Sequence, residues 1–120
     1  MPKPAIVLMP YDPGWAQAFE QARTAIIRAC GEHVLEVLHI GSTAIPGIAA
    51  KPVIDMMPLL RRHEDGFACV RAMAALGFEF RGDAGLGGRH YFIKGQPRTH
   101  HVHMYQSDHP EVGRHIRFRD

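Results

Sequence analysis

The sequence predicts an α+β domain in which a mixed β-sheet is flanked by helices. Two segments, residues 13–30 and 61–76, carry apolar side chains at helical spacing. Two runs, residues 34–40 and 53–59, are short, mostly apolar and bounded by turn residues, as strands are. Residues 78–105 hold three further strand-like runs separated by glycine-containing turns, which is typical of a meander.

The first half of the chain begins with an apolar run, Ala5 to Met9, that predicts a strand. Asp12 is expected as the N-cap of the first helix, with Pro13 at its first helical position. Gly31 is expected to end that helix. One face of it repeats at intervals of four, three, four and four residues: Trp15, Phe19, Ala22, Ile26 and Cys30. A strand over 34–40, the Gly-Ser-Thr turn 41–43, an irregular segment 44–51 and a strand over 53–59 follow.

The second half starts with the helix predicted over 61–76, for which Gly77 is a suitable C-cap. Its buried side is expected to consist of Phe67, Val70, Met73 and Ala74. Strands are predicted over 78–81, 89–94 and 99–105, and a last helix from about Glu111. The glycine-rich segment 82–88 lacks the following helix of a phosphate loop, so it is interpreted as a flexible hairpin or lid.

Composition limits the classes of function. The chain has 120 residues, enough for one domain, with 46% hydrophobic and 22% charged residues. Its 14 Lys and Arg nearly balance 12 Asp and Glu, and no nucleic-acid motif is present, so a nucleic-acid partner is not expected. Cys30 and Cys69 form no ligand motif and are interpreted as reduced core residues. Without a secretory or bilayer-spanning run, a cytoplasmic location without a membrane partner is expected.

The turn at Gly41, Ser42 and Thr43 is a candidate phosphate site. Glycine lets backbone N–H groups approach an anion closely, and the hydroxyl adds a further donor. The alternative is a plain turn that ends a strand. Fourteen residues after Gly41, Asp55 is a carboxylate inside an apolar strand, which is costly unless a cation or metal ion pairs it. The alternative is a structural carboxylate bonded to backbone N–H groups or to an Arg or Lys.

Histidines form the second candidate group. On a strand, His101 and His103 share one face, and with Asp55 they would make a set of two histidines and one carboxylate. Such a set favours Zn²⁺, Mn²⁺ or Fe²⁺ over Mg²⁺; the alternative is that these histidines hydrogen-bond a substrate or each other. His39 and His90 are further candidates for the same pocket. Four others are interpreted as surface or capping residues: His33, His63, His109 and His115.

Two cations lie near the strands that carry the candidate site. Lys51 precedes the strand of Asp55, and Arg89 opens the strand that follows the glycine-rich segment. Either side chain could pair with a phosphate or a carboxylate, and the arginine could do so through two parallel hydrogen bonds. The alternative for each is a solvated surface charge.

The run from His39 to Asp55, with its sequence HIGSTAIPGIAAKPVID, closely resembles the signature of the GrpB family, a branch of the nucleotidyltransferase superfamily. Three more segments resemble that family: LMPYDPGW at 8–15, RTHHVHMY at 98–105 and RHIRFRD at 114–120. The resemblance implies a nucleotidyltransferase-like fold. It also implies transfer from a nucleotide to a small molecule or protein, with a divalent metal (Mg, Mn or Zn). Asp55 would be the catalytic metal ligand, while Gly41 and Ser42 would hold the triphosphate of a nucleotide or another phosphorylated small molecule.

The chain departs from the superfamily pattern at one position. Nucleotidyltransferases place a second carboxylate two residues after the first, and here that residue is Met57, which cannot bind Mg²⁺. A non-catalytic accessory module is therefore an alternative, as in related domains fused to dephospho-coenzyme A kinase. A metal-dependent hydrolase that uses histidine and aspartate is another. Members of the resembled family continue into further helix, so residues 1–120 are expected to form one domain lacking C-terminal helices.

Overall fold

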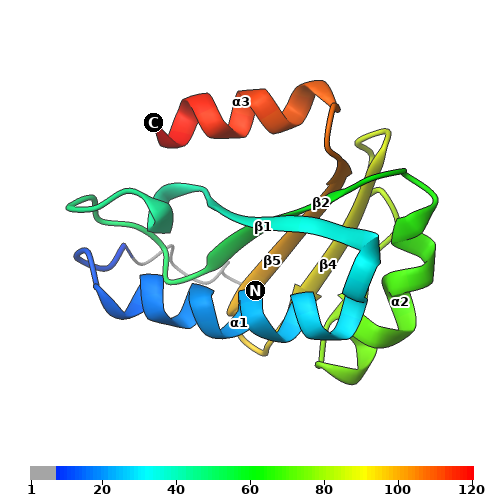
Figure 1. The fold of residues 1–120 in the computed structure, drawn as a ribbon. Helices are drawn as coiled ribbons and strands as arrows, with labels where there is room; N and C mark the ends of the chain where they lie inside the picture. The colour runs from blue at the N-terminus through cyan, green and yellow to red at the C-terminus, as the bar shows by residue number, and fades with distance from the viewer. Residues whose placement is uncertain (1–7) are drawn as a thin grey trace.

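The computed structural model describes residues 8–120, which form a five-stranded sheet and three α-helices (Figure 1). The sheet order is β1-β2-β5-β4-β3. The strands are β1 (Val34–Ile40), β2 (Ile54–Leu60), β3 (Glu79–Phe80), β4 (Arg89–Lys94) and β5 (His100–Gln106). The helices are α1 (Gly14–Cys30), α2 (Asp65–Ala75) and α3 (Pro110–Arg119). The predicted α+β class is confirmed.

The sheet is mixed, as predicted, because β2 runs parallel to β5 while all other neighbours are antiparallel. Strands β3, β4 and β5 are consecutive neighbours, which confirms the meander. In the register of the sheet, Ile40 of β1 lies beside Asp55 of β2, which lies beside His101 of β5. This crossover brings together residues that are far apart in the sequence.

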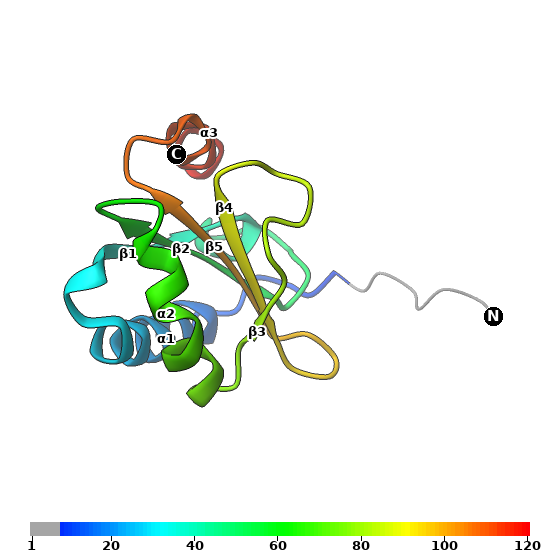
Figure 2. The same cartoon turned by 90° about the vertical axis from the view of Figure 1, so that its right-hand side faces the viewer.

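The two faces of the sheet are covered differently. Helices α1 and α2 lie on one face and α3 alone lies on the other (Figures 1 and 2). The larger core lies under α1 and α2, where Ile26, Met56 and Val102 are fully buried. A smaller apolar cluster lies under α3, where Val112 packs with Ile40, Met57 and Tyr105, among others. Strand alternation places Asp55 on the α3 face together with Met57.

Helix α1 differs from the prediction by one residue at its start. Pro13, not Asp12, is the residue before the first helical position. Asp12 still caps the chain locally, because its Oδ1 accepts a hydrogen bond from the backbone N–H of Gly14 at 2.8 Å. The predicted end is confirmed: Gly31 follows the helix with φ of +58°, a conformation that glycine adopts without steric cost.

Helix α2 is shorter than predicted and starts at Asp65 instead of Arg61. The expected buried face was partly wrong, because Phe67 is 59% exposed and Ala74 is also exposed, whereas Cys69 and Met73 are buried. The end at Gly77 is confirmed by paired backbone bonds, in which the N–H of Gly77 donates to Ala74 and that of Phe78 to Met73. This pairing satisfies carbonyls that the helix leaves free.

The strand predicted over residues 5–9 falls largely outside the described residues; within them, Met9 forms a single antiparallel bridge to Ala50. Strands β2 and β5 each begin and end one residue later than predicted, and β3 is shorter. Segment 82–88 forms turns, as expected, and α3 begins one residue before the predicted start. No helix within residues 8–120 is both long and apolar enough to cross a membrane.

Candidate functional site

Asp55 lies at the centre of a polar cluster on the face of the sheet that α3 covers. Its Oδ1 lies 3.2 Å from Nε2 of His103 and 3.4 Å from Nδ1 of His101. The three side chains are mostly buried, being 27%, 14% and 21% exposed, respectively. The parallel pairing of β2 with β5 produces this cluster, because it sets the two histidines of one strand face next to the carboxylate.

The carboxylate of Asp55 is held in its charged form. Burial favours the neutral acid and raises the pKa, but the hydrogen bonds from His101 and His103, together with their electrostatic interaction with the carboxylate, lower it more. The pKa of Asp55 is thereby lowered to about 2. The group therefore remains a carboxylate, able to bind a cation, at any physiological pH.

Gly41 lies directly against Asp55, and this contact explains why a glycine stands there. Its φ of +73° and ψ of −174° are a backbone conformation essentially confined to glycine. A Cβ atom at this position would lie 2.8 Å from Oδ2 of Asp55 and 3.1 Å from its Cβ. The turn therefore closes onto the carboxylate, so that the candidate phosphate turn and the candidate metal ligand are adjacent.

Thr43 and His39 support this turn through hydrogen bonds. The hydroxyl of Thr43 donates to the carbonyl of Val53 at 3.3 Å, so it accepts from Nε2–H of His39, which lies 3.0 Å away. Thr43 is only 3% exposed, and the ring of His39 stacks on Phe19 with centroids 4.6 Å apart. Burial lowers the pKa of His39 to about 4. The negative charge of Asp55 raises this pKa by less than burial lowers it, and the positive charge of Arg119 lowers it slightly further. His39 is thus a neutral supporting residue.

A pocket of about 290 Å³ opens beside the cluster. Ser42, Thr43, Lys51, Asp55 and His101 contribute to its lining. The structure therefore brings together most of the residues expected around a phosphate. Lys51 is exposed and lines this pocket together with Asp55, so a positive and a negative side chain border the same space.

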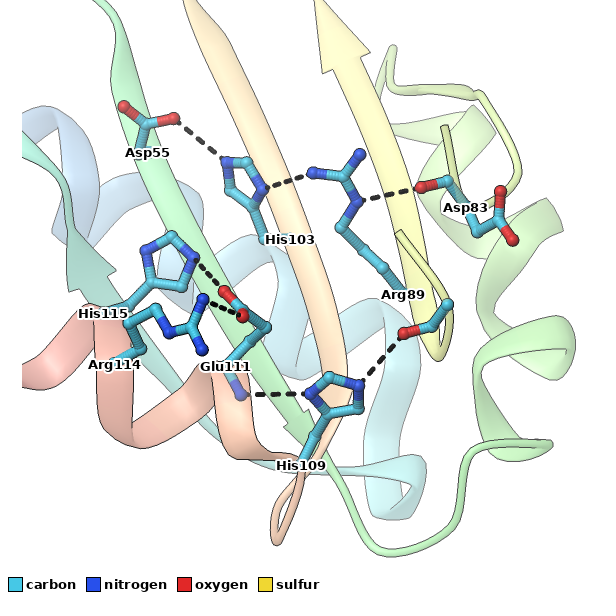
Figure 3. A network of polar contacts seen from close by, with 9 residues as sticks. Asp55, Asp83, Arg89, His103, His109, Glu111, Arg114 and His115 are labelled. Carbon is cyan, nitrogen blue, oxygen red and sulfur yellow. Dashed lines mark hydrogen bonds and ion pairs between the residues drawn. The ribbon is translucent and has the colours of Figure 1, made fainter. Parts of the chain in front are cut away.

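Arg89 does not line that pocket and is not a surface cation. It is only 9% exposed, and its Nε and Nη2 donate to the backbone carbonyls of Asp83 and Ala84 at 3.1 and 3.3 Å. Its Nη1 lies 3.3 Å from Nδ1 of His103, on the side of that ring away from Asp55 (Figure 3). The guanidinium also lies over the ring of Tyr91, 4.4 Å from its centroid. A buried cation bonded in this way contacts the site through His103.

Helix α3 contributes residues that the sequence pattern did not reveal. The ring of His115, interpreted above as a surface residue, lies over His103 with centroids 5.7 Å apart. Glu111 lies beside it, with Oε2 3.9 Å from Nε2 of His115, and also pairs with Arg114 at 3.0 Å (Figure 3). Arg119 donates to the backbone carbonyl of His39 at 3.3 Å. A helix that folds back over the sheet leaves no local signal for these contacts.

The remaining histidines lie away from the cluster. The proposal that His90 shares the pocket is wrong, because it points to the opposite face, packs against Gly66 and donates to the carbonyl of His63 at 2.8 Å. His63 is stacked on His90 rather than solvated. The capping role of His109 is confirmed, since its Nδ1 accepts from the N–H of Glu111 at 3.1 Å. His33 is 38% exposed and lies 3.7 Å from Asp65.

The donor set of the cluster fits a divalent cation. One ligand atom each from Asp55, His101 and His103 lie within 4.8 Å of one another. Two imidazole nitrogens and one carboxylate oxygen suit Zn²⁺ or Mn²⁺ better than Mg²⁺. Met57 is fully buried and adds no oxygen ligand at the next position of the same strand face.

Comparison with known proteins identifies relatives of the whole chain. A family model described as "GrpB protein" matches residues 5–120. The UPF0157 protein YqkA of Bacillus subtilis is 40% identical over 120 residues, covering 99% of this chain and 35% of that protein. The glutamate-rich protein GrpB of Alkalihalophilus pseudofirmus is 28% identical, with 98% and 71% covered. The chain spans only 35% to 60% of the length of four curated relatives that it matches.

Two solved structures show which fold the chain shares with known proteins. The conserved protein GrpB from Enterococcus faecalis superimposes with a TM-score of 0.90 at 40% identity, over 94% of this chain and 70% of that one. Cid1 in complex with the UTP analogue UMPNPP superimposes with a TM-score of 0.58 at 11% identity, over 92% of this chain and 36% of Cid1. The likeness to Cid1 shows a nucleotidyltransferase-like fold.

Proposed function

The chain belongs to the GrpB family, and we propose that it is a nucleotidyltransferase domain that uses a nucleotide and a divalent metal to modify a small molecule or protein. One observation carries this proposal. Asp55 and His101 belong both to the candidate metal cluster and to the pocket that Ser42 and Lys51 line. A cation held by the cluster would therefore face the same space as an anion held at the turn. The complex of Cid1 with a UTP analogue makes a nucleoside triphosphate the first ligand to test.

The residues of the pocket have distinct roles in this proposal. Lys51, together with Ser42 and the backbone beside Gly41, would bind the phosphate oxygens, and Asp55, His101 and His103 would hold the metal. The metal, when bound, supplies positive charge that stabilises the phosphate oxygens during transfer. In the reaction, an acceptor oxygen forms a bond to the α-phosphorus while the bond to the bridging oxygen of the β-phosphate breaks. Pyrophosphate leaves, and the acceptor proton passes to solvent.

A thermal-shift experiment tests the proposal directly. We would measure the melting temperature with each of the four nucleoside triphosphates and Mg²⁺, Mn²⁺ or Zn²⁺. A ligand at 100 times its Kd adds about 2.7 kcal/mol of stability, which for a chain of this size corresponds to a shift of roughly 10 °C. We expect the shift to require nucleotide and metal together and to disappear in Asp55→Asn.

Asp108→Asn is the matched control, because it makes the same chemical change at an exposed turn before α3. It should keep the full shift. A folded wild-type protein that no combination stabilises would refute the proposal, as would a shift that persists in Asp55→Asn. A shift produced by Zn²⁺ or Mn²⁺ alone, without any nucleotide effect, would instead favour a metal-dependent hydrolase built on the histidines and Asp55.

A non-catalytic binding module is the second candidate, and the environment of Met57 favours it. Met57 is part of the apolar cluster under α3 and has no exposure to solvent. The strand position that would carry a second carboxylate is thus built into a core. In that case, a nucleotide would stabilise the chain in the thermal-shift experiment, but no release of pyrophosphate would accompany binding with any acceptor.

A further inference from the structure

The contact between Arg89 and His103 fixes where the proton of the imidazole lies. A guanidinium carries only N–H donors, so Nδ1 of His103, 3.3 Å from Nη1 of Arg89, must be the acceptor. The ring proton is then on Nε2, which lies 3.2 Å from Oδ1 of Asp55. The three side chains form a directional chain of hydrogen bonds from Arg89 through His103 to Asp55 (Figure 3).

A metal-bound histidine requires the opposite arrangement. The nitrogen that binds the metal has no proton, and the other ring nitrogen carries the proton and donates it to a carbonyl, carboxylate or water. If Nε2 of His103 bound a metal beside Asp55, an N–H on Nδ1 would point at the N–H groups of Arg89. The two donors and the positive charge of the guanidinium would then oppose metal binding by this ring.

We propose that Arg89 is a positioning residue that controls metal binding, because it holds His103 in the tautomer that bonds to Asp55. This inference rests on the metal site of the proposed function. According to this proposal, His103 would be able to bind the metal only when the guanidinium of Arg89 no longer donates to its Nδ1. Arg89 therefore acts on the metal through His103, which differs from the sequence-based expectation that it pairs directly with a phosphate.

The loop before β4 sets the position of the guanidinium. Two of the three acceptors of Arg89 are backbone carbonyls of this loop, those of Asp83 and Ala84. Ala84 itself has a φ of +50°, an uncommon conformation for a residue with a side chain. A displacement of this loop would remove the hydrogen bonds that aim Arg89 at His103, so the conformation of the loop is coupled to the readiness of His103 to bind a metal.

Two substitutions separate the effect of the donor from that of the bulk of the side chain. Arg89→Met removes all donors and the charge but keeps an unbranched side chain, whereas Arg89→Lys keeps a cation that only donates. We would measure the affinity of wild type and both variants for Mn²⁺ and Zn²⁺ by titration calorimetry. We expect Arg89→Met to bind about tenfold more tightly than wild type, the scale on which residues behind a ligand affect metal sites. Arg89→Lys should stay within about threefold of wild type.

A second measurement needs no metal. Long-range ¹H–¹⁵N correlation spectra report which ring nitrogen of a histidine carries the proton, and His103→Gln would assign the signal of His103. We expect the proton on Nε2 in the metal-free wild type and in Arg89→Lys, and a mixture of tautomers in Arg89→Met. This readout remains decisive if Arg89→Met is less stable than wild type, because the wild-type spectrum alone tests the premise.

The outcomes distinguish this inference from the proposed function. A proton on Nδ1 of His103 in the metal-free wild type would overturn the inference and leave the metal site untouched. Equal metal affinity of Arg89→Met and Arg89→Lys would do the same. If neither wild type nor either variant bound Mn²⁺ or Zn²⁺, both the metal site and the control by Arg89 would be refuted.

Discussion

Replacing Gly41 by alanine adds a single methyl group, but it should destabilise the protein and disturb the candidate site strongly. Alanine at φ of +73° and ψ of −174° is strained, which costs about 1–3 kcal/mol. The new Cβ would also lie 2.8 Å from Oδ2 of Asp55, closer than such contacts occur. Asp55 must then move away from His101 and His103, and each weakened hydrogen bond to a charged group costs about 1.5–3 kcal/mol. We expect the displacement to cost the equivalent of one such bond, so that the total loss in the free energy of unfolding is about 2.5–6 kcal/mol.

Gly31→Ala is the matched control for backbone strain. Gly31 has a φ of +58° and a ψ of −134°, also in a region that favours glycine, but a Cβ there meets no atom within 4 Å among the described residues. It should lose only the conformational part, about 1–3 kcal/mol. Urea denaturation at pH 7, followed by circular dichroism, measures both variants.

The difference between the two variants isolates the contact with Asp55. In an Asp55→Ala background the carboxylate oxygens are gone, so Gly41→Ala should cost less there than in wild type. If Gly41→Ala and Gly31→Ala were equally destabilising, or if Asp55→Ala left the cost of Gly41→Ala unchanged, the reasoning about this close approach would be wrong.

Three further predictions concern the surroundings of the site. Because burial lowers the pKa of His39 to about 4, the unfolded chain binds more protons than the folded chain between pH 6.5 and pH 4. The free energy of unfolding, measured by urea denaturation, should therefore fall by at most about 3 kcal/mol as the pH is lowered from 6.5 to 4, and by less in His39→Gln. Val112→Ala, on the buried side of α3, should cost about 2 kcal/mol in the same assay. Phe118 of the same helix is 63% exposed, so Phe118→Ala should change stability by less than about 0.5 kcal/mol. The buried hydroxyl of Tyr105 has no hydrogen-bond partner among the described residues, so Tyr105→Phe should leave stability unchanged within about 0.5 kcal/mol or raise it, and a loss above 1 kcal/mol would show a missing partner.

Elements that carry a strong local pattern were predictable from the sequence. The apolar face of α1 from Trp15 to Cys30 repeats at helical spacing, and its end at Gly31 follows from the freedom of glycine. The start of α2 was missed because Arg61 to Glu64 have no apolar periodicity to separate turn from helix. Phe67 was placed in the core by periodicity alone, but the helix turns Gly66 toward His90, which leaves Phe67 at the surface.

The candidate site was predictable only in part. Alternation along a strand placed His101 and His103 on one face, but their meeting with Asp55 depends on the parallel pairing of β2 with β5, which no local pattern encodes. The interior position of Arg89 depends on two loop carbonyls, and that of His115 on α3 folding back over the sheet. These are long-range contacts, and single residues give no indication of them in advance.

The face of the sheet under α3 has two parts with different chemistry, and Met57 lies in the apolar part. A carboxylate at that position would be buried among Ile40, Tyr105 and Val112, where an unpaired charge is strongly unfavourable. The packing of α3 is therefore incompatible with the usual pair of carboxylates two residues apart. If this domain transfers nucleotides, the candidate ligands beside Asp55 are His101 and His103 of β5, and the inference above makes metal binding by His103 depend on Arg89. Met57 thus contributes to the apolar support of α3, while the candidate nitrogen ligands beside Asp55 lie on the neighbouring strand β5.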